Sequence, residues 1–176
     1  MNIDNLNLIP YNDPILHQPC QKWDFTNPEF DIAVFAENLV KKMREARGIG
    51  LSANQVGIPY KIFSMETDPA IVVINPKIIA ISDETIVLDE GCLSYPGLSV
   101  KVKRPRSVTA RFNFPNGMAQ THTFTDITAR CFLHEYDHIE NGEVFINRAN
   151  FFHKEKAEKN WTKILKNGRN NERKLG

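Results

Sequence analysis

The hydrophobic residues near the start of the chain repeat with the period of a helix. Between residues 29 and 47, apolar residues recur at intervals of three and four, which places them on one helix face. Gly48 follows as a residue suited to end a helix. The pattern predicts an amphipathic helix over 29–47 whose apolar stripe consists of Ile32, Phe35, Ala36, Leu39, Val40 and Met43.

The middle of the chain changes to the patterns of β-strands. Runs rich in Ile and Val predict strands at 61–65, 71–79 and 85–88, and an alternation of apolar and polar residues extends over 98–114. Asn116-Gly117 predicts a hairpin turn, so a returning strand is expected at 121–124. Consecutive strands joined in this way predict a mostly antiparallel sheet.

Two further helices are predicted after the strands. One extends from about Asp126 to Glu140, where Asn141-Gly142 ends it, and the other covers 154–166. On the latter, Trp161 is interpreted as a packing residue. A helix, a run of strands and then helices indicate an α+β fold rather than a parallel doubly wound sheet.

Composition places the chain among single globular domains of a reducing compartment. Its 176 residues suit one domain, and 41% hydrophobic and 24% charged residues exclude wholesale disorder. Three cysteines are too few, and odd in number, for a disulfide framework. Residues 1–10 lack the basic start of a signal peptide, and no apolar run approaches a membrane span, so a cytoplasmic protein is predicted.

The net charge of +1 argues against a general nucleic-acid coat protein, but it conceals an uneven distribution. From Asn150 onward there are eight Lys or Arg and three Asp or Glu, a net of +5, which leaves −4 for the rest. The basic end is either a solvated helix face or an electrostatic contact for nucleic acid.

His134, Glu135 and His138 form an H-E-x-x-H motif on the second predicted helix. Spacing of i and i+4 places both imidazoles on one face, where they can bind one divalent cation. The glutamate lies to the side, where its carboxylate can serve as general base toward a water. The alternative is a coincidental pair of helix histidines.

A metal site of this kind needs a third ligand, and two cysteines are candidates. Cys131 lies one turn before His134, but it is seven residues from His138, about 10.5 Å along a helix, which is too far for a shared ion. Cys92, in the segment Glu90-Gly91-Cys92-Leu93-Ser94, is the better candidate. Its interpretation as an ordinary buried thiol stays open at this point.

Glycines and small residues gather in the segment from Gly48 to Gly57. The segment does not match the phosphate-loop pattern, and it lacks the preceding strand of a dinucleotide fingerprint. By itself it is interpreted as a tight turn after a helix.

Taken together, Gly48–Gln55, Glu90–Ser94 and His134–His138 resemble the three motifs of the peptide deformylase family. The resemblance extends through about Arg148. It implies antiparallel sheets packed around a central helix carrying H-E-x-x-H, with N-terminal and C-terminal helices. It also implies a catalytic domain at 1–148 and a basic helix and tail at 149–176.

The family removes the N-formyl group from the N-terminal methionine of newly synthesised polypeptides and releases formate. The resemblance therefore implies a metal-dependent hydrolase, typically with Fe²⁺, for which Zn²⁺, Ni²⁺ or Co²⁺ also suit the ligand set. The implied partners are a nascent formyl-Met peptide and, through the basic tail, the ribosome; no membrane is expected. The alternatives are a broader H-E-x-x-H metallopeptidase and a non-catalytic ribosome-associated metal protein.

The resemblance also implies roles for individual residues. The metal ligands would be Cys92, His134 and His138, and Glu135 would be the acid and base. Gln55 and the backbone N–H of Leu93 would stabilise the oxyanion, and Gly50 would pair with the substrate main chain. The substrate side chain would lie against Ile49, Leu88, Ile127 and Cys131.

Three positions depart from the family pattern or vary within it. Leu133 stands where Gln is usual, which costs a hydrogen bond or exchanges it for packing, and Ser52 stands where Ala is usual. Arg130 is predicted either to cover the pocket with its stem while its charge reaches solvent, or to face water.

Glu90 and Arg104 are either an ion pair or two solvated charges.

Overall fold

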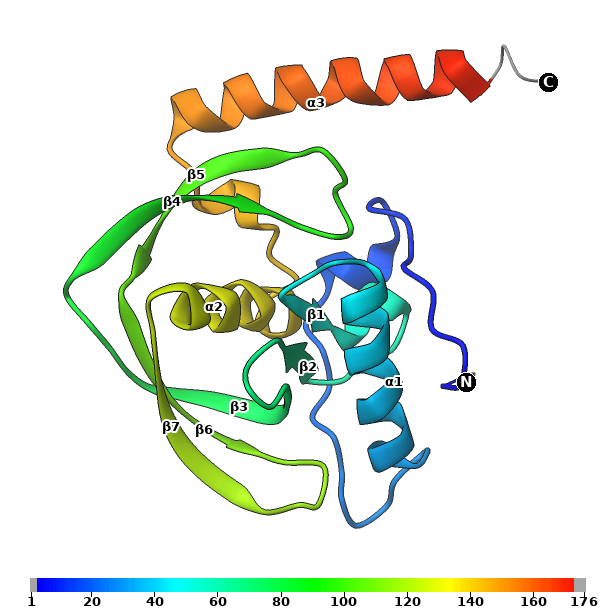
Figure 1. Ribbon diagram of the computed structural model, residues 1–176, viewed down its shortest axis with the longest axis vertical. Helices are drawn as coiled ribbons and strands as arrows, with labels where there is room; N and C mark the ends of the chain where they lie inside the picture. Colours follow the sequence, from blue (N-terminus) through cyan, green and yellow to red (C-terminus); the bar gives the residue numbers. More distant parts are fainter. Residues whose placement is uncertain (1–2, 173–176) are drawn as a thin grey trace.

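A computed structural model describes the backbone of residues 3–172 and side chains to residue 166 (Figure 1). Within this part of the chain there are three α-helices and three short 3₁₀ helices. The α-helices are α1 (Ile32–Glu45), α2 (Asp126–Glu140) and α3 (Phe151–Glu172). The 3₁₀ helices are η1 (Pro14–His17), η2 (Ala53–Val56) and η3 (Phe145–Arg148).

The strands form two antiparallel sheets. The larger sheet has the order β1-β2-β3-β6-β7, and the smaller consists of β4 and β5. The strands of the larger sheet are β1 (Gly50–Ser52), β2 (Ile62–Met65), β3 (Ile71–Ile81), β6 (Ser107–Asn113) and β7 (Ala119–Thr125). Those of the smaller sheet are β4 (Thr85–Gly91) and β5 (Ser99–Pro105). This architecture confirms the predicted α+β class with antiparallel sheets.

The predicted elements are present with shifted ends. The first helix begins at Ile32 because the Asp31 side chain accepts hydrogen bonds from the N–H groups of Ala33 and Val34. The alternating run 98–114 divides around Arg106 into two strands that belong to different sheets. Proline at 105 lacks a backbone donor, which suits the end of a strand.

The interpretation of residues 48–57 as no more than a tight turn is wrong. Gly50–Ser52 forms β1, which pairs with β2 at the edge of the larger sheet, and η2 follows directly. A three-residue strand is too short for its period to be visible in the sequence. The consequence is that this segment is held rigidly beside α2, with which β1 is in contact.

Helix α2 lies centrally, between the two sheets (Figure 1). On one side its Phe132 ring packs edge-on against Phe63 of β2 and stacks with Phe124 of β7. On the other side, β5 and η3 contribute a second apolar cluster that includes Val102 and Phe145. Because both faces of α2 are covered, most polar side chains between Arg130 and His138 are withdrawn from water.

Helix α3 lies along the outer side of the smaller sheet and contacts β5 (Figure 1). Its Ala157 is buried, and the Trp161 ring packs against Tyr11 and Tyr95, which confirms the prediction that Trp161 is a packing residue. Among the helices that the structure describes, none is long and apolar enough to span a membrane.

Candidate active site

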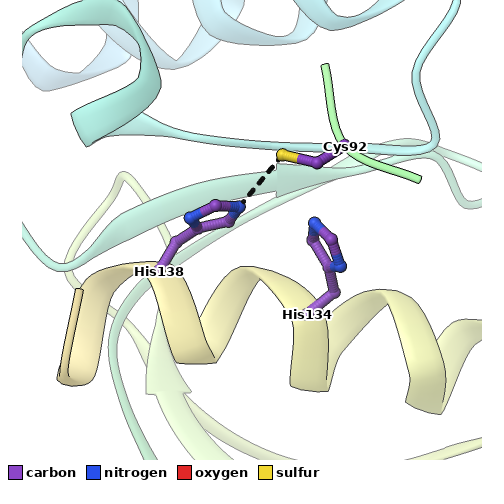
Figure 2. A group of neighbouring side chains, drawn as sticks. All are labelled: Cys92, His134 and His138. Carbon is purple, nitrogen blue, oxygen red and sulfur yellow. Dashed lines mark hydrogen bonds between the residues drawn. The ribbon is translucent and has the colours of Figure 1, made fainter. Parts of the chain in front are cut away.

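The structure brings Cys92, His134 and His138 together. Both imidazoles point from α2 toward the thiol, which follows the end of β4 (Figure 2). The sulfur and one ring nitrogen of each histidine all lie within 4.8 Å of one another, and Cys92 Sγ is 3.3 Å from His138 Nε2. One thiolate and two imidazoles form a donor set that suits divalent transition metals such as Fe²⁺, Zn²⁺, Co²⁺ and Ni²⁺.

Cys131 takes a different role. Its Sγ lies 3.2 Å from the backbone oxygen of Ile49 and donates a hydrogen bond to it. Burial raises the pKa of this thiol well above its usual value, so it stays protonated. Cys131 lines the cavity but does not belong to the cluster of candidate metal ligands.

Glu135 is buried beside this cluster. Among the described residues its Oε2 has no hydrogen-bond partner, and a Cβ at Gly50 would lie only 2.5 Å from its Oε1. Burial disfavours the charged carboxylate and raises its pKa to about 7. A carboxyl group near neutrality, with one oxygen free, can take up and release a proton at physiological pH.

Gln55 is held so that its amide nitrogen points toward Cys92. Its Nε2 is 3.3 Å from Cys92 Sγ and 3.0 Å from Ser94 Oγ, while its Oε1 accepts a hydrogen bond from the Ser52 N–H at 2.9 Å. Ser52 Oγ also lies 3.0 Å from Gln55 Oε1 and 2.8 Å from Asn54 Oδ1. The serine that departs from the family pattern therefore braces this amide.

Glu90 connects His134, one of the candidate metal ligands, to a buried ion network. Its Oε2 lies 3.2 Å from His134 Nδ1, and Arg104 donates two hydrogen bonds to its carboxylate, at 2.8 and 2.9 Å. Of the two alternatives for Glu90 and Arg104, the structure shows the ion pair, and it is buried. Burial opposes ionisation of Glu90, but the hydrogen bonds and charges of Arg104 and His134 outweigh it and lower its pKa to about 2.

Arg130 lines the cavity, as one of the two predicted alternatives has it, but its charge does not reach solvent as both alternatives expected. The residue is 5% exposed, and its guanidinium donates to Glu90 Oε1 at 2.6 Å. It also donates to the backbone oxygens of Val102 and Ile86, at 3.0 and 2.7 Å. Arg130 thus ties α2 to both strands of the smaller sheet, which local sequence does not indicate.

Asp137 extends the network on the other side of Arg104. It accepts hydrogen bonds from Arg104 at 2.6 Å and from Arg148 at 2.7 Å, and Arg148 also pairs with Glu143 at 2.7 Å. Sequence reasoning missed this part of the site. The signal available was a charged residue on the buried stretch of the helix, between the two histidines.

A cavity of about 660 Å³ opens beside the cluster of candidate metal ligands. Its lining includes Gly50, Ile49, Gln55, Cys92, Leu93, Ile127, Cys131, His134 and Glu135. The described residues that line it do not include Leu88, whose side chain is 41% exposed on β4. Leu133 does not face the cavity either: it is buried in the core cluster around Phe132, so packing takes the place of a hydrogen bond here.

Comparisons with known proteins show which family this chain is similar to. A model of the polypeptide deformylase family matches residues 5–155. The peptide deformylase of Agrobacterium fabrum is 32% identical over 172 residues, which cover 94% of this chain and 98% of that protein. The peptide deformylase of Desulforudis audaxviator is 36% identical over 152 residues, covering 85% and 96%.

Solved structures give the same result. The peptide deformylase of Thermus thermophilus superposes with a TM-score of 0.84 at 28% identity, covering 92% of this chain and 96% of that chain. The enzyme of Synechococcus elongatus, solved in complex with actinonin, superposes with a TM-score of 0.78 at 33% identity, covering 88% and 86%.

Proposed function

The chain belongs to the peptide deformylase family, a family of hydrolases that remove the N-formyl group from polypeptides, and from this premise we propose that the cavity beside Cys92 is its active site. The observation that carries the proposal is that the buried carboxyl group of Glu135 lines one cavity with Cys92 and His134, two members of a cluster able to hold a metal ion. The substrate is the formylated N-terminal methionine of a newly synthesised polypeptide, and the product is formate.

Cys92, His134 and His138 are the residues that would hold the metal, with Fe²⁺ as the proposed native ion and Zn²⁺, Ni²⁺ or Co²⁺ as replacements. A bound ion would polarise the formyl oxygen and lower the pKa of water. Glu90 supports the ligand set, since a carboxylate next to Nδ1 of His134 would leave Nε2 available to hold the metal.

Glu135 is proposed as the acid and base of the reaction. It accepts the proton of the water that attacks the formyl carbon and later gives this proton to the departing amine. Its position supports the assignment, because it lines the cavity and its pKa of about 7 lies near the working pH. The absence of a side chain at Gly50 leaves the room that this carboxyl occupies.

Gln55 and the backbone N–H of Leu93 are proposed to stabilise the oxyanion, where one donor typically contributes about 3–4 kcal/mol. Both residues line the cavity, and the Gln55 amide already points toward Cys92. Gly50 is proposed to pair with the substrate main chain. The methionine side chain would lie against Ile49, Ile127 and Cys131, with Leu88 nearby at the exposed face of β4.

The decisive test is formate release from formyl-Met-Ala-Ser by anaerobically prepared protein, with metal analysis of the same sample. We expect stoichiometric formate and free Met-Ala-Ser. Release of amino acids instead would favour a broader metallopeptidase. Glu135→Ala should keep the metal and lose formate release by about a hundredfold or more. Glu37→Gln, an exposed glutamate of α1, is the matched control.

A second set of proposals concerns the C-terminal part and the location of the protein. We propose that 1–148 is the catalytic domain and that 149–176 is a basic helix and tail that contacts the ribosome, in the cytoplasm. Exposed lysines of α3, among them Lys156, Lys159 and Lys166, support the contact, whereas the side chains of Arg169, Glu172, Arg173 and Lys174 lie outside the described residues.

Replacing these three lysines by glutamine tests the ribosome contact without removing α3. We expect weaker co-sedimentation with ribosomes at low salt, and the difference should vanish at high salt because the contact is electrostatic. Unchanged co-sedimentation at low salt would contradict the proposal.

A further inference from the structure

Trp161 of α3 stands against a turn that borders the active-site cavity. Its indole N–H donates a hydrogen bond to the backbone oxygen of Pro96, at 3.0 Å. Its ring lies 5.6 Å from the ring of Tyr95 and 4.8 Å from that of Tyr11, measured between centroids. One turn further along α3, Ile164 comes within 3.4 Å of the position that a Cβ would take at Gly97.

The segment that Trp161 touches forms a wall of the cavity. Tyr95, Pro96, Gly97 and Leu98 all line it. The segment also begins next to a metal ligand, because the Tyr95 N–H donates to the backbone oxygen of Cys92 at 2.9 Å. A change in the conformation of this segment would therefore alter the shape of the cavity.

The conformation of this turn depends on one peptide unit. The Leu98 N–H donates to the Tyr95 oxygen at 3.0 Å, and Gly97 has a φ of +79°. Proline followed by a glycine with positive φ is typical of a type II turn, which differs from type I mainly by rotation of the central peptide. That peptide carries the Pro96 oxygen, so the bond from Trp161 selects one of its two orientations.

We infer that Trp161 is a positioning residue for the active site: through Pro96 and Tyr95 it holds the cavity wall in the shape that accepts the substrate. The inference rests on the proposed function of the cavity. It makes α3 a support of the catalytic unit as well as a basic appendage. Because Trp161 acts on the cavity through Pro96 and Tyr95, its loss should weaken substrate binding more than the chemical step.

Steady-state kinetics of three variants test this inference. Trp161→Ala should raise KM about threefold to tenfold, as expected for the loss of one hydrogen bond and its packing, with kcat within about twofold. Trp161→Phe keeps ring packing but lacks the donor, and should fall between Trp161→Ala and wild type. Asn160→Ala, an exposed neighbour on the same helix, should match wild type.

The kinetics decide whether Trp161 positions the cavity wall or only packs α3 against the rest of the protein. If Trp161→Ala keeps the wild-type KM, the inference is wrong. Should this variant fail to fold, Trp161→Phe decides instead, since it preserves the aromatic contacts. Equal losses of kcat and kcat/KM would also overturn the inference, because they would place Trp161 in the chemical step.

The indole N–H signals in a ¹⁵N–¹H NMR spectrum give a test that does not depend on turnover. The chain has two tryptophans, and Trp23 lies in a separate cluster with Phe30 and Tyr60. Adding the product peptide Met-Ala-Ser should shift the Trp161 signal, which Trp161→Phe identifies, and leave that of Trp23 in place. A stationary Trp161 signal in an active, saturated enzyme would contradict the inference, whereas absent formate release would contradict the proposed function.

Discussion

Glu90 Oε2 lies 3.2 Å from Nδ1 of His134, and it does so while Arg104 and Arg130 bind the same carboxylate. A metal-ligating histidine oriented by a carboxylate binds its ion more tightly than one left to rotate. The arrangement therefore couples the proposed metal site to an ion network buried between α2 and the smaller sheet. Removing the negative charge of Glu90 should therefore affect both metal binding and the stability of the ion network.

Glu90→Gln should weaken metal affinity by about tenfold to a hundredfold, because the neutral amide orients His134 less strongly. It should also lower the free energy of unfolding by about 3–5 kcal/mol, since the buried Arg130 loses its carboxylate partner and Arg104 keeps only that of Asp137. Competition with a metal chelator and denaturant titration measure the two effects. Asp89→Asn, at an exposed neighbouring position, should change neither, and wild-type metal affinity in Glu90→Gln would contradict the coupling.

Cys92→Ala should abolish retention of the metal, while Cys131→Ala should retain it. Cys92 Sγ belongs to the cluster of three donor atoms, whereas Cys131 Sγ is engaged by the Ile49 oxygen. Metal analysis of both purified variants, with circular dichroism as a check on folding, measures the difference. Equal metal contents in the two variants would show that the ligand assignment is wrong.

Gly50→Ala should abolish deformylation, because its Cβ would lie 2.5 Å from Glu135 Oε1 and 2.7 Å from Cys131 Sγ. The clash must displace the Glu135 carboxyl or move β1. Gly91→Ala serves as a control for stability, since the nearest neighbour of its Cβ, the Leu98 oxygen, would lie at an ordinary 3.5 Å. Thermal unfolding measures any loss of stability in each variant, and formate release measures the loss of activity. Full activity of Gly50→Ala would contradict the close approach of Gly50 to the Glu135 carboxyl.

Cys20 should resist alkylation until the protein unfolds. Burial raises the pKa of its thiol from 9.0 to about 12, and Lys61 offsets only part of that effect. Because the folded state holds this proton more tightly, the resulting stability is complete below about pH 9 and is lost as the pH rises toward 12. Iodoacetamide labelling of native protein at pH 8.5, followed by peptide mapping, should find Cys20 unmodified, whereas urea-unfolded protein should be labelled.

The sequence by itself determined those features that depend on local periodicity. The i and i+4 spacing of His134 and His138 places both on one helix face wherever the helix lies, because 3.6 residues make a turn. The rise of a helix likewise separates Cys131 from His138, whatever the helix packs against. Strands were predictable for a similar reason, since the two-residue period of a strand is visible within a few residues. The hairpin turn at Asn116-Gly117 indicated that consecutive strands are antiparallel.

Only the tertiary structure decided which distant residues meet. Arg130 gives no local sign that its partners are Glu90, Val102 and Ile86, because these are brought to it by the pairing of β4 with β5 and the packing of α2. The contact of Trp161 with Pro96, 65 positions away, depends in the same way on where α3 lies. Spacing along one helix follows from backbone geometry, but contacts between elements depend on how the whole chain packs.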